Sequence, residues 1–502
     1  MTRCVVFGAT GYLGGRLVPA LLAAGHQVRV LARAPGKLTE VPWRDRVEIL
    51  EGDVTDPGSV RDALAGQDVV YYLVHSLNRR DFVEVDRRAA HVLADAVRVS
   101  GVGRLVYLGG ITPDAQRLSD HLASRAEVGR ILLDSGVPTV VLQAAVILGS
   151  GSASFEMLRY LTERLPVMIT PRWVHNRIQP IAVRDVLHYL THAATLPPQV
   201  NRAFDIGGPE VLTYLEMMRR YAVVAGLPRR VVLPVPVLTP WLSAQWVNLV
   251  TPVPRSIAIP LIESLVHEVV CHDHDIAGHI PDPEDGLTHY EHAVELALTH
   301  IRHADVPTRW SDASSPEAPS APLSTDPHWS GGSLYQDIRE HHSAADPRTL
   351  WEVIEAIGGE HGWYSFPLAW SVRGWIDQLV GGVGLRRGRR DPHRLHVGEA
   401  LDFWRVEYLD RPRLLRLRAE MRLPGRAWLE LEVIPDGDGG ARYRQRALFE
   451  PHGLAGHLYW RTIAPFHGII FGGMVRNITG AAEHRARRAS RPAACVVPEG
   501  EQ

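Results

Sequence analysis

The sequence contains very little cysteine, since Cys4, Cys271 and Cys495 are the only three among 502 residues. An odd and widely spaced set does not resemble the disulfide framework of a small secreted domain. Met1-Thr2-Arg3 leads directly into an apolar run, without the basic region, long apolar core and cleavage site of a secretory signal. We therefore expect a protein of the reducing cytoplasm.

The sequence also lacks an excess of charge of either sign, because its net charge is only −2. This balance argues against binding nucleic acid through overall positive charge, and we expect no nucleic-acid partner. Hydrophobic residues make up 45% and charged residues 22%, which is ordinary for a folded soluble chain. Length alone leaves the oligomeric state open, but it allows about three domains.

A long uninterrupted hydrophobic span is missing as well. Residues 231–254 carry no Asp, Glu, Lys or Arg, yet the segment contains Gln245, Asn248 and five prolines. In lipid, each helical hydrogen bond lost at proline would need another partner. We predict that the segment is buried or lines a pocket. A membrane-surface contact is the alternative, which would make this a membrane-associated cytoplasmic protein.

Short apolar runs alternate with segments of helical periodicity from residue 3 to about residue 145. This alternation predicts repeated β-α units and a doubly wound parallel sheet of the α/β class. The expected strands are Arg3–Phe7, Gln27–Leu31, Val47–Leu50, Asp68–Val74, Arg104–Leu108 and Thr139–Leu142. Two later runs, Ile178–Val183 and Arg202–Ile206, should extend the sheet or build a small substrate-side lobe. We predict a first domain over residues 1–230, with an apolar substrate-side or interdomain extension over 231–310.

The composition changes at residues 311–333, which are dense in Ser, Pro, Ala and Gly and are typical of a linker. A second domain of α+β class is expected over residues 334–485, and a flexible tail over 486–502. It should begin with a strand at 334–342 and a helix from Asp346-Pro347 to Ile357, and should end with a long helix from about 454 to 478. Between these helices four antiparallel strands are expected: Leu401–Tyr408, Leu414–Met421, Ala427–Ile434 and Ala441–Glu450.

The strongest motif is Gly8-Ala9-Thr10-Gly11-Tyr12-Leu13-Gly14, which joins the first expected strand to the first expected helix. A pyrophosphate requires backbone N–H groups and a helix N-terminus close to its oxygens. Side chains at Gly8 and Gly11 would block that approach, and Gly14 allows helix and strand to pack closely. The turn, with Thr10, Tyr12 and Leu13 between its glycines, therefore predicts a dinucleotide site.

The second strand is followed by Arg33, where an NAD-specific protein usually has an acid for the ribose hydroxyls. A guanidinium favours a 2′-phosphate through charge-assisted hydrogen bonds. We therefore predict a preference for NADP(H), with Lys37 as a helper. NAD(H) and a merely solvated Arg33 are the alternatives.

Two other strand ends are candidates for contact with the dinucleotide. Asp53-Val54 follows the third strand and could meet the adenine, and Leu73-Val74-His75 follows the fourth strand where a cofactor would cross the sheet edge. Packing of strand ends is the alternative for both.

With these residues the first 300 positions resemble the short-chain dehydrogenase/reductase superfamily, specifically its extended and atypical, NmrA-like or epimerase-like members. The resemblance rests on the segments Gly8–Gly14, Asp53-Val54, Gln179–Val186 and Phe204–Thr213. It implies a Rossmann fold that binds NAD(P). The whole layout is similar to bacterial atypical members fused to a domain of unknown function, and the second domain resembles the START/Bet v 1 helix-grip fold.

The sequence departs from the family at its catalytic residues. The resemblance implies a Tyr-x-x-x-Lys pair after the fifth strand and a Ser at the end of that strand. Here the aligned pair is His121 and Arg125, and the strand ends in Gly109-Gly110. Histidine can act as a general acid near neutral pH, and Arg125 could hold a ribose hydroxyl. An ordinary helix histidine is the alternative.

The remaining titratable cluster, around Cys271 and His272, has poor spacing for a metal, so we predict no metal site.

The sequence thus predicts an NADP(H)-binding oxidoreductase of atypical short-chain type that acts on a small apolar carbonyl or quinone-like compound. The alternative is a non-catalytic NADP(H)-binding sensor or scaffold, with a second domain that binds a lipid or another apolar ligand.

Overall fold

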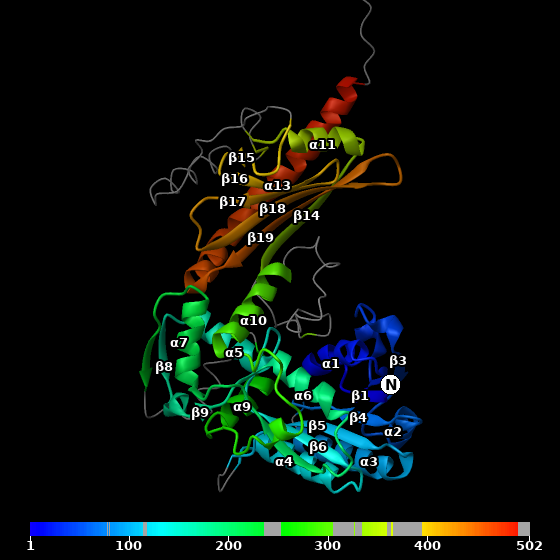
Figure 1. Cartoon of the computed structure of the whole chain (residues 1–502). Helices are drawn as coiled ribbons and strands as arrows, with labels where there is room; N and C mark the ends of the chain where they lie inside the picture. Colours follow the sequence, from blue (N-terminus) through cyan, green and yellow to red (C-terminus); the bar gives the residue numbers. More distant parts are fainter. Residues whose placement is uncertain are drawn as a thin grey trace, which may run out of the picture. The chain divides into compact units, whose positions relative to one another are not determined.

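The computed structural model describes residues 1–77, 79, 81–113, 118–234, 251, 253–304, 326, 334–358, 363–364 and 394–489. The chain divides into two compact units, Met1–Gly332 and Ser333–Gln502 (Figure 1). Of the expected linker, Asp326 alone is described, and its carboxylate pairs with Arg16 of the first unit at 2.6 Å. Residues 386–390, whose sequence Arg-Arg-Gly-Arg-Arg is a local concentration of positive charge, lie outside the described residues.

The first unit is built on a seven-stranded sheet in the order β11-β6-β5-β4-β1-β2-β3. Its strands are β1 (Arg3–Phe7), β2 (Gln27–Ala32), β3 (Glu48–Glu51), β4 (Val69–Tyr72), β5 (Arg104–Gly110), β6 (Thr139–Ala144) and β11 (Arg202–Ile206). All neighbouring strands pair in parallel. The predicted parallel α/β sheet is therefore confirmed, and its strand order reverses between β1 and β4, where such sheets bind ligands.

Helices cover both faces of this sheet (Figure 1). Along β1, Cys4 and Val6 belong to the core under α1 (Tyr12–Ala23) and α6 (Val183–Ala193). Val5 and Phe7 belong to the core under the helices of the opposite face. Those helices are α2 (Pro57–Leu64), α3 (Phe82–Ser100) and α4 (Asp120–Leu133). Alternate residues of a strand point to opposite faces, so a strand buried on both sides is apolar throughout.

A smaller lobe follows the sheet and has a core of its own. Its helices are α5 (Ala153–Arg164), α7 (Tyr214–Val224), α9 (Arg255–Ser264) and α10 (Tyr290–Ala304). Its short strands are β7 (Ile147–Leu148), β8 (Val167–Thr170), β9 (Arg177–Ile178), β10 (Ile181–Ala182), β12 (Leu212–Thr213) and β13 (Val231–Pro234). Short 3₁₀ turns lie at Pro35–Leu38, Arg44–Arg46, Arg172–His175 and Asp275–Gly278.

The prediction of one strand over Ile178–Val183 is wrong. The segment instead contributes to two short strands, β9 and β10, with Gln179-Pro180 between them, and Val183 already begins α6. Pro180 has no N–H to donate, so it interrupts a ladder where an ordinary residue would continue it.

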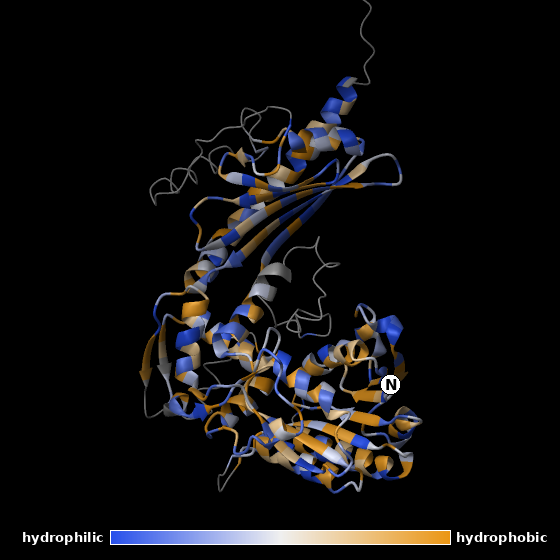
Figure 2. Cartoon of the chain, viewed as in Figure 1, coloured by the Kyte–Doolittle hydropathy of each residue, from blue (hydrophilic) through white to orange (hydrophobic). Residues whose placement is uncertain are grey.

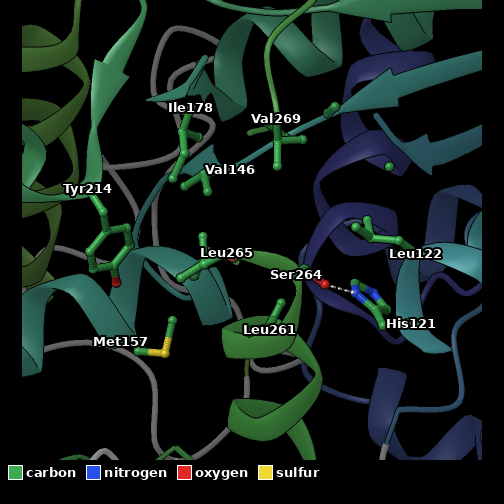
Figure 3. Close-up of a pocket in the computed structure, with 14 residues that line it drawn as sticks. His121, Leu122, Val146, Met157, Ile178, Tyr214, Leu261, Ser264, Leu265 and Val269 are labelled. Atoms are coloured by element: carbon green, nitrogen blue, oxygen red, sulfur yellow. Dashed lines mark hydrogen bonds between the residues drawn. The ribbon is translucent and has the colours of Figure 1, made fainter. Parts of the chain in front are cut away.

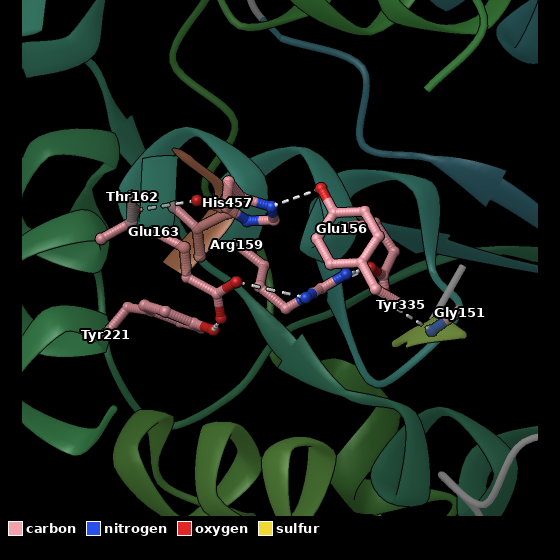
Figure 4. Close-up of polar contacts among 9 residues, drawn as sticks. Gly151, Glu156, Arg159, Thr162, Glu163, Tyr221, Tyr335 and His457 are labelled. Carbon is pink, nitrogen blue, oxygen red and sulfur yellow. Dashed lines mark hydrogen bonds and ion pairs between the residues drawn. The ribbon is translucent and has the colours of Figure 1, made fainter. Parts of the chain in front are cut away.

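Buried charges connect α5 to its neighbours in the lobe (Figure 4). The side chain of Arg159 is 2% exposed, and its guanidinium pairs with Glu156 at 2.7 Å and with Glu163 at 3.3 Å. The Tyr221 hydroxyl of α7 donates to Glu163 at 2.6 Å, and the Gly151 N–H donates to Glu156 at 3.0 Å. Because a buried charge is costly without its partner, this network favours one arrangement of α5 against α7 and the preceding loop.

Of the apolar segment 231–254, residues 235–250 and 252 lie outside the described part. Val231–Pro234 forms β13, which pairs in parallel with β8. Among the helices that the structure describes, none is both long enough and apolar enough to cross a bilayer.

The second unit is a six-stranded sheet in the order β14-β19-β18-β17-β16-β15, with antiparallel neighbours. The strands are β14 (Tyr335–Ser343), β15 (Ala400–Leu401), β16 (Trp404–Asp410), β17 (Leu414–Ala419), β18 (Gly425–Pro435) and β19 (Ala441–Pro451). The helices are α11 (Pro347–Glu355), capped by Asp346, and α13 (Gly453–Ala489). The predicted antiparallel sheet with a long final helix is confirmed.

Two details of that prediction are wrong. The expected strand 401–408 is broken at Asp402, whose φ of +53° turns the chain out of the extended conformation between β15 and β16. Helix α13 continues to Ala489, so residues 486–489 are helical and not part of a flexible tail; residues 490–502 lie outside the described part.

One face of the second sheet is apolar and packs against helices, which gives its strands the alternating colours of Figure 2. Leu415, Leu417 and Leu429 share a core with Met474 and Ile478 of α13. The aromatic side chains Trp363, Phe403 and Trp404 also pack in that core, with ring centroids 5.7–6.1 Å apart. These aromatic residues therefore form part of the domain core.

Candidate active site

The glycine turn after β1 has the geometry of a phosphate cradle. Gly8 has a φ of +97°, and a Cβ there would lie 2.8 Å from the Leu73 carbonyl oxygen. A Cβ at Gly14 would overlap the Gly8 carbonyl. Gly11 is the N-cap of α1 and has no side chain to bind the first N–H groups of the helix. Those N–H groups are therefore available to a phosphate, and the residues present fit the dinucleotide that the fold implies.

At the end of β2, Arg33 and Lys37 are both exposed at the surface. Burial raises the pKa of the nearby Asp53, but hydrogen bonds from Thr55 and the charges of Arg33 and Arg79 outweigh it, so the net shift is downward. The Asp53 carboxylate accepts from the Thr55 N–H at 2.8 Å and from its hydroxyl at 2.7 Å. Arg33 is therefore close enough to Asp53 for its charge to favour the ionised carboxylate.

At the end of β4, the chain passes from the sheet directly to a histidine–carboxylate pair. The Leu73 N–H donates to the Phe7 carbonyl at 2.9 Å and so continues the sheet. His75 Nδ1 lies 2.8 Å from Asp86 Oδ2 in α3, and the Ser76 N–H donates to the same carboxylate at 3.1 Å. Because a carboxylate can only accept here, Nδ1 carries the proton and His75 Nε2 is the unprotonated nitrogen.

The structure brings His75 and His121 together, although they are far apart in the sequence. Their rings stack with centroids 5.2 Å apart and an interplanar angle of 27°. One turn after His121 on α4, Arg125 donates to the Leu108 carbonyl at the end of β5, and its guanidinium lies 5.5 Å from the centre of the Tyr107 ring. The two residues predicted to replace the family Tyr and Lys therefore both lie at the carboxyl end of the central strands.

Ser264, the last residue of α9, determines the tautomer of His121. Its hydroxyl donates to the Pro260 carbonyl at 2.8 Å and lies 2.9 Å from His121 Nδ1. A hydroxyl has one hydrogen, so the proton between Ser264 and His121 belongs to Nδ1. The Nε2 atom of neutral His121 is then a hydrogen-bond acceptor and a base.

Both imidazoles are held in the neutral form. Burial lowers the pKa of His121 well below its usual value, and His75 and Arg125 act in the same direction. Burial also lowers the pKa of His75, as does Arg125, while the hydrogen bond and charge of Asp86 oppose the shift. His121 has no such carboxylate partner among the described residues, so its cationic form is the less favoured of the two.

His121 forms part of the wall of a largely apolar cavity of about 70 Å³ (Figure 3). The cavity lies between the carboxyl ends of β5 and β6 and the lobe formed by α5, α7 and α9. Its wall consists of Gly110, His121, Leu122, Ala144, Ala145, Val146, Ser154, Met157, Ile178, Tyr214, Leu261, Ser264, Leu265 and Val269. A site next to the nucleotide-binding edge of the sheet is where a hydride acceptor or donor would be held.

The cluster around Cys271 is engaged in backbone contacts. The Cys271 N–H donates to the Gln179 side chain at 3.1 Å, and the His272 N–H donates to Asp205 at 2.8 Å. Within the described ranges, no group of three or more His, Cys, Asp or Glu side chains is arranged to hold a metal ion.

Fold and site together define an NAD(P)-binding protein of the oxidoreductase-like Rossmann class. Residues 8–143 match a family described as NAD(P)H-binding, and residues 329–474 match a family described as a protein of unknown function, DUF2867. The two family matches fall in the two structural units, apart from the first four residues of the second match.

Among curated relatives, a Streptomyces griseus (4-alkanoyl-5-oxo-2,5-dihydrofuran-3-yl)methyl phosphate reductase is 30% identical over 233 residues, which are 45% of this chain and 75% of the reductase. A ceramide reductase of Caulobacter vibrioides is 27% identical over 46% of this chain and 73% of that protein. The chain therefore belongs, through its first unit, to the family of NAD(P)-binding oxidoreductase-like proteins that includes the Streptomyces reductase.

Other similarities are more limited. An uncharacterized protein of Mycobacterium tuberculosis is 28% identical over 45% of this chain, and the chain spans only 23% of the length of that relative. Among solved structures, Citrobacter triphenylmethane reductase complexed with NADP(H) covers 59% of this chain and 100% of its own, at 20% identity and a TM-score of 0.48.

Sequence reasoning did not identify the residues that complete the site. Asp86 and Ser264 position the two imidazoles, and Met157 and Tyr214 line the cavity, yet none belongs to a recognised motif. The nearest sequence signal was the segment Phe204–Thr213, which ends one residue before Tyr214.

Proposed function

We propose that the protein is an NADP(H)-dependent oxidoreductase of atypical short-chain type that acts on an apolar carbonyl or quinone-like compound. The observation that carries the proposal is the position of His121, in the wall of an apolar cavity at the carboxyl end of the nucleotide-binding sheet. Two curated relatives with reductase names support the reaction class.

The bound dinucleotide would supply or accept a hydride, and the protein must then move one proton at the substrate oxygen. His121 Nε2 is the proposed proton carrier, because the contact with Ser264 leaves that nitrogen unprotonated. Neutral His121 takes the proton of an alcohol at Nε2 during oxidation. During reduction a proton from solvent must first reach Nε2, and His121 then passes it to the substrate oxygen. Arg125 takes the place of the family lysine and is proposed to hold a ribose hydroxyl, while Asp86 holds His75 against the His121 ring.

The preference for NADP(H) rests on Arg33, which is exposed after β2 where an acid would favour NAD(H). The proposed contacts of the dinucleotide are Gly8, Thr10, Gly11, Tyr12, Leu13, Gly14, Arg33, Asp53, Val54, Leu73, Val74 and His75. A guanidinium that pairs with a 2′-phosphate is worth about 1–3 kcal/mol, or roughly 5- to 150-fold in affinity.

Titration calorimetry with NADPH and NADH tests the cofactor preference. We expect tighter binding of NADPH, and Arg33→Glu should remove the difference between the two cofactors. Arg229→Glu is the matched control, since Arg229 is exposed on a different part of the first unit. A preference for NADPH that survives in Arg33→Glu would contradict the proposal.

Oxidation of NADPH with a panel of ketones and quinones tests the reaction itself. Turnover that is lost in His121→Asn, while the affinity for NADPH is kept, supports the oxidoreductase.

The alternative is a non-catalytic NADP(H)-binding sensor or scaffold. The observation that favours it is the strand end Gly109-Gly110, which offers no hydroxyl where catalytic family members have one. NADPH binding without turnover of any compound in the panel would support this alternative.

For the second unit we propose a helix-grip fold that binds a small apolar ligand. The six-stranded antiparallel sheet with the long helix α13 packed against its apolar face supports this proposal.

A bilayer-surface contact of the protein is a further proposal, supported by the exposed apolar side chains Leu454, Leu458 and Phe466 of α13. Sedimentation with anionic and neutral vesicles tests the membrane contact.

A further inference from the structure

Tyr214 stands apart from the other residues of the cavity because its polar atom is unused. Tyr214 is the first residue of α7 and is 1% exposed. Its hydroxyl is buried and makes no hydrogen bond within the part of the chain that the structure describes. Burying a hydroxyl without a partner costs about 1–3 kcal/mol, so the arrangement needs an explanation.

The surroundings of Tyr214 point to a ligand as the missing partner. Tyr214 lines the same cavity as His121, and Figure 3 shows the two residues on opposite sides of it, with apolar side chains such as Leu261 and Leu265 between them. Trp173 packs edge-on against Tyr214 with ring centroids 5.9 Å apart, which holds the phenol ring in place. The indole N–H of Trp173 is itself buried and without a partner among the described residues.

We propose that the cavity takes an apolar molecule with two oxygen functions, one at each end. The first oxygen meets His121 and belongs to the reacting group, so this inference rests on the proposed function. The second oxygen accepts a hydrogen bond from the Tyr214 hydroxyl. The apolar walls between them select an apolar framework, and Tyr214 is then a specificity-determining residue.

The chemistry of Tyr214 defines the second oxygen as an acceptor. Burial raises the pKa of Tyr214, so its hydroxyl keeps its proton at physiological pH and donates. The neighbouring indole N–H can also only donate. A ketone, ester, ether or quinone oxygen therefore fits, whereas a saturated hydrocarbon end leaves the hydroxyl unpaired.

Paired substrates test the proposal directly. Each diketone is compared with the monoketone that has a methylene in place of the second carbonyl: 1,4-cyclohexanedione with cyclohexanone, and the smaller, flexible hexane-2,5-dione with hexan-2-one. A site built to bind an oxygen disfavours the analogue that lacks it. We expect kcat/KM to be higher by about 5- to 150-fold for the diketone of the better-fitting pair, mainly through KM, as for one hydrogen bond made to a buried hydroxyl.

Tyr214→Phe keeps the aromatic ring and removes the hydroxyl. It should bring the ratio for the two ketones close to two, because a symmetric diketone presents two equivalent carbonyls to the site. Tyr72→Phe is the matched control, since the Tyr72 hydroxyl is also buried and unpaired among the described residues but does not line the cavity. This control should keep the ratio. A ratio of about two or less in the unmodified protein, or a ratio unchanged in Tyr214→Phe, overturns the inference and leaves the proposed oxidoreductase intact. Failure to turn over any ketone or quinone overturns both.

Discussion

Replacing Ser264 with alanine tests the tautomer on which the proposed chemistry depends. Ser264 as a residue is only 9% exposed, and its hydroxyl is the partner of His121 Nδ1 at 2.9 Å. Alanine leaves the Nδ1–H without an acceptor in a buried place. The loss of this acceptor shifts the tautomer equilibrium of His121 from Nδ1–H toward Nε2–H. The nitrogen that acts as a base in the cavity wall would then be a hydrogen-bond donor.

The size of the effect follows from the lost hydrogen bond. An unpaired buried donor costs about 1–3 kcal/mol. If this cost falls on the proton-transfer step, kcat decreases by roughly 5- to 150-fold, because about 1.36 kcal/mol corresponds to one decade in rate. The rate of NADP⁺ reduction with the alcohol formed from the best ketone measures the decrease, because in that direction neutral His121 Nε2 acts as the base. A long-range ¹H–¹⁵N spectrum of labelled histidine measures the tautomer of His121 independently of turnover.

Ser154→Ala is the matched control, because Ser154 lines the same cavity and undergoes the same chemical change. We expect a clear loss of rate and a changed nitrogen spectrum in Ser264→Ala alone. The reasoning is refuted if both variants keep the rate and the His121 spectrum of the unmodified protein.

Two further predictions concern the cofactor turn and the dependence of stability on pH. Gly14→Ala should abolish NADPH binding in calorimetry and lower the free energy of unfolding by about 1–3 kcal/mol, because the added Cβ overlaps the Gly8 carbonyl. Gly36→Ala is the control and should change neither quantity, since there is open space around Gly36. Equal binding by both variants would contradict the cradle. The pKa of His121 is lowered in the folded state, so its stabilising contribution is full above the unfolded pKa of about 6.5 and is lost as the pH falls toward the lowered value. Urea unfolding at pH 7.5 and 5.5 should therefore show a smaller loss on acidification in His121→Gln than in the unmodified protein, and equal losses would contradict the assignment.

The strands and the nucleotide turn could be predicted because their signals are local. The apolar run of β1 and the glycines at positions 8, 11 and 14 lie within a dozen residues, and their periodicity and φ requirements depend on near neighbours. The same local reasoning failed at Gln179-Pro180, where one proline divides an expected strand in two. It also failed at Asp402, where a positive φ interrupts an apolar run.

The sequence by itself determined a parallel α/β unit with a dinucleotide turn and an antiparallel unit after it, and it offered His121 and Arg125 as candidates for the family pair. Only the tertiary structure decided how His121 is used. Ser264, which sets its tautomer, lies 143 positions away on α9, and His75, which stacks on it, is fixed by Asp86 from α3. No local sequence pattern specifies these long-range contacts, because they depend on the packing of whole helices against the sheet. The Tyr214 hydroxyl can be recognised as buried and unpaired only in the folded structure, because residues from other elements exclude water from it.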